Sequence, residues 1–174
     1  MFALVYVDRL DLSASDVGVI GVLGAAATTV SFLAWGAVAD RFDALAAMRY
    51  GSLVGLAGLI AYALAPGLAV LLIAALAIGL SNSSIEIGVT GVISDNTPLA
   101  SRAAAMSGWN AITGARGLVA PFFMSGLVQF GIVNVTTGLL LCAAASGTGV
   151  ALFWWAAQRA RSEAGVPAAA KAAG

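Results

Sequence analysis

The sequence predicts an all-α integral membrane protein with five complete membrane-spanning helices. Of its 174 residues, 61% are hydrophobic and only 9% are charged, whereas about 25% of the residues of a soluble globular domain are charged. The apolar residues fall in five runs separated by turn-forming residues, and each run supplies the roughly 20 residues that a spanning helix needs. These runs lack the short alternating pattern of a membrane β-barrel, so helices are the expected structure.

Each span is predicted from an apolar run and from the polar or helix-breaking residues at its ends. The first span follows a polar loop in which Ser13 or Ser15 can cap the helix N-terminus. The second span ends before Pro66 and Gly67, a pair typical of a turn. The predicted spans, within one bundle of residues 1–157, are residues 17–39, 48–65, 68–94, 103–130 and 132–157.

Basic residues fall almost entirely on one side of the predicted membrane. Because Lys and Arg accumulate on the cytoplasmic side, we expect the first span to enter from outside and the C-terminus to lie in the cytoplasm. Residues 158–174 are predicted to form a disordered cytoplasmic tail, and the Ala- and Gly-rich composition favours a bacterial inner membrane. One side receives Arg41, Arg49, Arg102, Arg159, Arg161 and Lys171, and the other receives only Arg9.

Composition also excludes several function classes. The chain contains no histidine, which rules out a Ser-His-Asp triad. Its single cysteine, Cys142, cannot form an intrachain disulfide, and a chain with one cysteine and no histidine is not expected to hold a metal or another cofactor. Eight basic residues balance eight acidic ones, without the clustered basic face that a nucleic acid requires. We therefore expect neither an enzyme nor a nucleic-acid-binding protein.

The first residues of the chain form a short apolar segment. Residues 1–7 are too few to span a bilayer and lack the positive charge of a signal peptide. Two interpretations remain open, a short interfacial anchor or the last two turns of a helix whose beginning lies outside this sequence.

A short motif stands at the predicted cytoplasmic end of the first span. Gly36, Asp40 and Arg41 form a Gly-x-x-x-Asp-Arg arrangement. The glycine lets two helices approach closely, the aspartate can cap a neighbouring helix and the arginine can pair across the loop. The arrangement resembles the loop signature of the major facilitator superfamily, which occurs between the second and third helix of each six-helix half. Residues 43–45 depart from it, because the family motif continues with a glycine and paired basic residues.

Two later stretches are also similar to this family. Residues 101–108 resemble the start of its eleventh helix, and residues 114–121 resemble that helix in some members. The resemblance implies that the five spans are helices eight to twelve and that residues 1–7 end the seventh, so that the chain has the architecture of the C-terminal half.

The resemblance also implies a function. It predicts secondary-active transport of a small solute across the lipid bilayer by alternating access, with protons as the candidate coupling ion, as in a permease or efflux carrier. The chain would be part of a transporter that also needs an N-terminal six-helix half or a second copy. The alternative is a non-transporting membrane subunit, such as a sensor or an assembly partner.

Two charged side chains lie deep inside the predicted spans, near the centre of the bilayer, where a charge costs at least about 2.5 kcal/mol. Glu86 lies in the third span, with Asn82 one turn earlier, and Arg116 lies near the middle of the fourth, after Asn110. In the family fold these two spans line the central cavity. All four residues are therefore candidates for substrate binding or proton coupling: Glu86 could take up a proton or a cationic group, and Arg116 could hold an anionic group.

A structural role for the two charges is the alternative. Glu86 and Arg116 could form a buried pair or fix helix packing through separate hydrogen bonds. Counted from the predicted helix ends, Arg116 lies roughly 8 Å deeper than Glu86 at about 1.5 Å per residue, which would strain a direct pair.

Pro121 interrupts the backbone hydrogen bonding of the fourth span and is expected to kink it. With Gly117 and Gly114 nearby it is a candidate hinge for alternating access, although tight helix packing also explains such glycines. Packing faces are expected at Gly18, Gly21, Gly24, Gly51 and Gly55.

Overall fold

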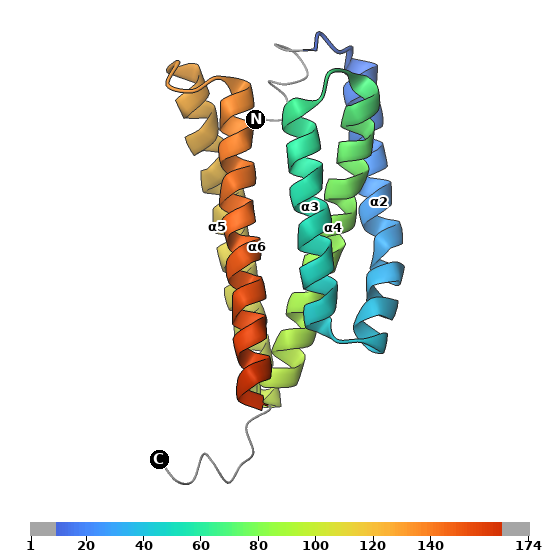
Figure 1. Ribbon diagram of the computed structural model, residues 1–174, viewed down its shortest axis with the longest axis vertical. Helices are drawn as coiled ribbons and strands as arrows, with labels where there is room; N and C mark the ends of the chain where they lie inside the picture. The colour runs from blue at the N-terminus through green and yellow to red at the C-terminus, as the bar shows by residue number, and fades with distance from the viewer. Residues whose placement is uncertain (1–9, 165–174) are drawn as a thin grey trace.

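The computed structural model describes residues 10–164, in which five helices run in alternating directions (Figure 1). All five are long and apolar enough to cross a membrane, and the described range contains no strand. The predicted all-α membrane architecture is therefore confirmed. The helices are α2 (Ala14–Arg41), α3 (Ala44–Leu64), α4 (Leu68–Asn96), α5 (Leu99–Gln129) and α6 (Val135–Ala164).

The helices extend beyond the predicted apolar runs at most of their ends. α5 begins at Leu99 rather than at residue 103, and α6 covers residues 135–164 rather than 132–157. Hydropathy marks the part of a helix that suits hydrocarbon, whereas the helix itself continues until a cap or a breaker ends it. Residues 158–164 are thus helical and not part of a disordered tail. Residues 1–7 and 165–174, for which an anchor or helix remnant and a tail are predicted, lie outside the described residues.

A side-chain cap explains where α2 begins. Ser13 is the N-cap of α2: its hydroxyl accepts a hydrogen bond from the Asp16 backbone N–H at 3.2 Å, and the Asp16 carboxylate accepts one from the Ser13 N–H at 3.1 Å. This reciprocal pair is a capping box. Of the two predicted caps, Ser13 is therefore the one used, and Ser15 lies inside the helix.

α4 packs closely against both α2 and α3 through small residues (Figure 1). A Cβ atom added at Gly51 or Gly55 of α3 would overlap a serine side chain of α4, which confirms the predicted packing face on α3. A Cβ added at Gly79 of α4 would likewise overlap the backbone of α2. On α2 the predicted face is confirmed at Gly24, where an added Cβ would lie 3.6 Å from the Ala75 carbonyl oxygen of α4, whereas an added Cβ at Gly18 or Gly21 meets no atom of the described residues within 4 Å.

Hydrogen bonds reinforce the contact between α2 and α4. The Thr28 hydroxyl donates to the Gly79 carbonyl at 3.1 Å, and the Trp35 indole N–H donates to the Leu80 carbonyl at 2.8 Å. The hydroxyls of Ser31 and Ser83, both buried, are also hydrogen-bonded to each other. Such bonds between helices are expected in a bilayer, where the hydrophobic effect does not drive helices together. α2, α3 and α4 therefore form one closely packed unit.

Among the described helices, α5 packs most weakly against this unit. None of its residues is buried, and it makes far fewer contacts with α4 and α6 than α3 makes with α4. α6, in contrast, packs on α3, and its Leu139 joins the buried core around Tyr62 and Leu71. Figure 1 shows α5 running beside α6, away from α2.

The close approach of α3 to α4 predicts a position-dependent effect of a large side chain. Gly55→Leu should destabilise the folded bundle by about 1–3 kcal/mol, because the leucine must displace Ser81 or push the helices apart. Gly18→Leu makes the same chemical change where space is open, and it should leave stability unchanged or slightly higher. Thermal unfolding of the purified variants in one detergent would measure the difference. Equal losses at the two positions would contradict the packing described here.

Candidate functional site

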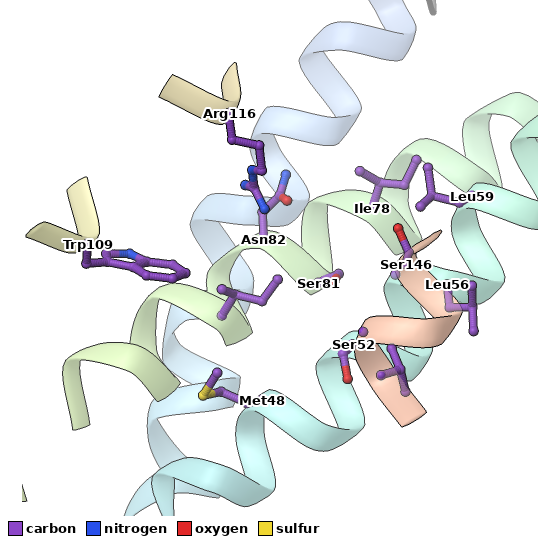
Figure 2. A pocket seen from close by; sticks show the side chains of 14 residues that line it. Met48, Ser52, Leu56, Leu59, Ile78, Ser81, Asn82, Trp109, Arg116 and Ser146 are labelled. Atoms are coloured by element: carbon purple, nitrogen blue, oxygen red, sulfur yellow. The ribbon is translucent and has the colours of Figure 1, made fainter. Parts of the chain in front are cut away.

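A cavity of about 440 Å³ lies between α3, α4, α5 and α6 (Figure 2). Its wall combines aliphatic side chains with hydroxyl, amide, indole and guanidinium groups. Arg116 is the one charged residue in this wall. The lining residues are Met48, Ser52, Gly55, Leu56 and Leu59 from α3, Ile78, Ser81, Asn82 and Ile85 from α4, Trp109 and Arg116 from α5, and Ser146, Gly149 and Val150 from α6.

Arg116 and Asn82 meet at this cavity from different helices. Figure 2 shows the guanidinium of Arg116 and the amide of Asn82 pointing toward one another. Asn82 also lines a second cavity of about 320 Å³, between α2, α3 and α4, together with Thr28 and Tyr62. The amide of Asn82 therefore stands in the wall of both cavities, and of the four predicted candidates only Asn82 and Arg116 are brought together.

Glu86 lies outside the cavity and does not pair with Arg116. Its side chain is exposed, and the ion pairs among residues 10–164 do not include one between these two groups. The helix bounds give the reason. α4 and α5 are antiparallel and joined at residues 97–98, and at about 1.5 Å per residue Glu86 lies about 15 Å from that connection and Arg116 about 26 Å. Asn82, at about 21 Å, is closer to the level of Arg116, so the interpretation of a buried Glu86–Arg116 pair is wrong.

The cavity face of α5 includes a residue that the sequence did not predict. Trp109 and Arg116 both line the cavity, and seven residues make about two helical turns, which places them on one face. The indole Nε1 of Trp109 is buried and has no hydrogen-bond acceptor among the described residues. Asn110 is turned about 100° away along the helix, is exposed and does not line the cavity. The spacing from Arg116 is the signal that could have identified Trp109.

The predicted loop motif at the end of α2 is arranged differently from the expectation. A Cβ at Gly36 would meet nothing within 4 Å, and Asp40 and Arg41 are both still inside the helix and exposed. The guanidinium of Arg41 lies 5.7 Å from the ring of Phe42. Gly36 therefore allows no close helix contact within the described part of the chain, and Asp40 caps no neighbouring helix there.

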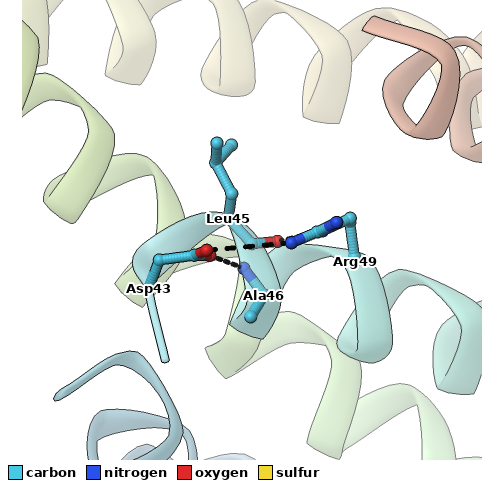
Figure 3. Close-up of polar contacts among 4 residues, drawn as sticks. All are labelled: Asp43, Leu45, Ala46 and Arg49. Atoms are coloured by element: carbon cyan, nitrogen blue, oxygen red, sulfur yellow. Dashed lines mark hydrogen bonds and ion pairs between the residues drawn. The ribbon is translucent and has the colours of Figure 1, made fainter. Parts of the chain in front are cut away.

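The cap and the ion pair of this loop come from Asp43 and Arg49 (Figure 3). Asp43 is the N-cap of α3, where its carboxylate accepts a hydrogen bond from the Ala46 backbone N–H. The same carboxylate lies 3.8 Å from the guanidinium of Arg49, whose side chain is only 10% exposed. The Arg49 Nε donates to the Leu45 carbonyl at 3.3 Å, and its guanidinium lies 5.7 Å from the ring of Trp154 on α6. Arg49 thus joins α3 to α6.

The candidate hinge lies in the weakly held part of α5. The helix continues through Pro121, which has no N–H to donate to the carbonyl of Gly117, four residues earlier. A Cβ at Gly114 or Gly117 would meet nothing within 4 Å. Tight packing within the described residues therefore does not account for these glycines, whereas a locally weakened helix is consistent with a hinge.

The loop geometry predicts that Asp43 and Asp40 differ in their contribution to stability. Asp43→Ala removes the N-cap of α3 and leaves the nearly buried Arg49 without its carboxylate, so a loss of about 1–2 kcal/mol is expected. Asp40→Ala, the matched change three residues away, should shift stability by less than about 0.5 kcal/mol. Chemical or thermal unfolding of both variants would measure this difference. A larger loss for Asp40→Ala would show that the motif aspartate has the structural role.

Comparison with known proteins identifies one family. A family model described as Major Facilitator Superfamily matches residues 1–174 of the chain. No curated protein and no solved structure matches it significantly.

Proposed function

The chain belongs to the major facilitator superfamily, and we propose that it takes part in secondary-active transport of a small solute by alternating access. Membership makes it a membrane transporter rather than an enzyme, in agreement with its five span-forming helices. The observation that supports the proposed mechanism best is the cavity with Arg116 in its wall, roughly midway along α5. Transporter sites lie near the middle of the bilayer, at the interface between the structural repeats.

The surface of α5 supports the proposal that a second helical bundle completes the transporter. α5 has no buried residue, yet it carries Ser107, Asn110 and Arg116 on exposed positions. Polar and charged side chains facing lipid are expensive and normally face protein or a water-filled cavity. A six-helix N-terminal half or a second copy of the chain would cover this surface.

The arrangement of basic residues supports a cytoplasmic C-terminus in a cell membrane, with a bacterial inner membrane as the proposed location. Arg41 ends α2, Arg49 and Arg102 lie near the starts of α3 and α5, and Arg159 lies near the end of α6. Because the helices alternate in direction (Figure 1), these four arginines belong to the same end of the bundle. An arginine-rich end is typical of the cytoplasmic side.

Glu86 is proposed as the coupling residue. Its carboxylate is exposed on α4, one turn from Asn82 and outside the cavity that Arg116 lines. A carboxylate inside a span, away from a basic partner, can take up a proton or a cationic group when a second bundle approaches. Glu86 and Arg116 would then act at separate points of the same transport cycle.

The coupling proposal predicts a selective defect in Glu86→Gln. A panel of solutes would first be screened for thermal stabilisation of the full-length protein, since a bound solute stabilises the folded state. For a solute so identified, Glu86→Gln should lower proton-driven uptake at least about tenfold in proteoliposomes while downhill exchange of the solute persists. Asp95→Asn, the same change near the end of α4, is the control and should transport normally. Normal proton-driven uptake by a folded Glu86→Gln protein would leave Glu86 without a coupling role.

The hinge proposal predicts that Pro121→Ala changes stability and transport in opposite directions. Alanine restores the hydrogen bond to the Gly117 carbonyl, so the midpoint of thermal unfolding should rise while the transport rate falls several-fold. Pro98→Ala is the matched control at the start of the same helix, where a proline costs no hydrogen bond. Rapid-mixing transport assays beside unfolding curves would test this. If the Pro121→Ala protein is more stable but transports at an unchanged rate, the proposal that Pro121 is a hinge is contradicted.

A further inference from the structure

We propose that the cavity between α3, α4, α5 and α6 binds an amphipathic organic anion, with its charged group at Arg116 and its apolar body along the aliphatic side chains of α3, α4 and α6. The inference rests on the proposed transport function for its biological role and names the class of solute. The binding itself is argued from the composition of the cavity wall.

The charge of the wall is the first argument. Arg116 is the one charged residue among the fourteen that line the cavity, and no aspartate or glutamate is among them. The ion pairs within residues 10–164 leave Arg116 without a carboxylate partner. A guanidinium in a region of low dielectric is stabilised by an anion that it can bind through two parallel hydrogen bonds. A carboxylate or sulfonate supplies that group.

Neighbouring hydrogen-bond donors are the second argument. Asn82 points its amide toward the guanidinium of Arg116 (Figure 2), and an amide NH₂ can donate to the same anionic group. Trp109 places in the same wall an indole N–H that is buried and has no acceptor among the described residues. An indole N–H is a donor only, so its unmet hydrogen bond favours a ligand that brings acceptors.

The rest of the cavity wall is aliphatic and suits the apolar part of such a ligand, which is the third argument. Leu56 and Leu59 of α3, Ile78 and Ile85 of α4 and Val150 of α6 all line the cavity. Figure 2 shows Leu56, Leu59 and Ile78 to one side of the Arg116–Asn82 pair, so the apolar part of the wall is offset from the charged part. A volume of about 440 Å³ lies within the usual range of small-molecule sites, roughly 300–1,000 Å³.

The depth of Arg116 argues for a solute rather than a lipid head group. Arg116 lies about 26 Å along α5 from Leu99 and about 20 Å from Gln129, at about 1.5 Å per residue. Lipid head groups lie at the two faces of a hydrocarbon layer about 30 Å thick, far from the middle of such a helix. A small amphipathic anion that enters the cavity can reach Arg116 at this level.

The test uses three brominated probes that share an eight-carbon chain and carry an anionic, a neutral or a cationic head group. Bromine quenches tryptophan fluorescence on contact, and Trp109 reports on the cavity. In nanodiscs of phosphatidylcholine containing the full-length protein, 8-bromooctanoate should quench saturably. The neutral 8-bromooctanol and the cationic 8-bromooctylammonium should give only the weak linear quenching of a probe dissolved in lipid. Saturable quenching of similar affinity by the alcohol or by the cation would overturn the assignment of an anion.

Variants locate the site. Arg116→Gln should weaken octanoate binding, measured by calorimetry, at least about tenfold, and Arg116→Lys should retain most of it because the charge remains. Trp109→Phe should remove most of the saturable quenching and weaken binding about threefold, since it loses the indole N–H. Arg102→Gln removes an arginine from the cytoplasmic end of the same helix and should bind normally. Circular dichroism and gel filtration would establish that each variant is folded.

The remaining outcomes separate this inference from the proposed transport function. Unchanged binding in both folded Arg116 variants, or displacement of the probe by phosphatidylglycerol added to the nanodiscs, would overturn the inference. Transport of a cationic or neutral solute by the full-length protein would do the same while leaving the transport function intact. Saturable anion binding without transport of that anion or of any other solute in proteoliposomes would support the site and contradict the proposed transport function.

Discussion

The close approach of α4 to α2 and α3 is the constraint on which the rest of the structure depends. In a bilayer, apolar side chains gain nothing by leaving lipid for protein, so helices associate through close packing and hydrogen bonds between them. Gly51 and Gly55 let the serines of α4 reach the backbone of α3, and Gly79 lets the backbone of α2 reach α4. With these contacts α4 has a fixed rotation about its axis, which in turn directs Asn82 and Ile78 to the cavity.

Much of this fold follows from the sequence, and the parts that do not have identifiable causes. The five runs of apolar residues locate the helices because bilayer thickness sets their length. They do not give the ends, since Ser13 and Asp43 begin helices through hydrogen bonds that hydropathy does not register. The glycine spacing identified the packing face on α3 and the contact of Gly24 on α2, but it also marked Gly18 and Gly21, which meet no described residue, because a small residue permits close approach without providing a partner.

The sequence predicts the type of residue at the candidate site, but it does not identify all the residues that line the cavity. A charged residue inside a span pointed to Arg116 because burying a charge is expensive in any membrane protein. The alternative of a Glu86–Arg116 pair is already strained on the predicted helix ends, and the observed start of α5 at Leu99 rather than at residue 103 places Arg116 still further from the loop that joins α4 to α5. Trp109 was missed because an aromatic residue in a span can have several functions. The seven-residue spacing between Trp109 and Arg116 becomes informative only when the structure shows which face of α5 lines the cavity.

The contrast between a closely packed unit and a weakly held helix suggests how binding and motion are linked. α5 contributes Trp109 and Arg116 to the cavity and no residue to the buried core. A ligand held by Arg116 on one side and by Asn82 on the other would add contacts between α5 and α4 that the chain itself lacks. Ligand binding shifts a conformational equilibrium only through such differential contacts. With the hinge proposed at Gly117 and Pro121, the next turn of α5 would respond to such a ligand while α2, α3 and α4 keep their packing.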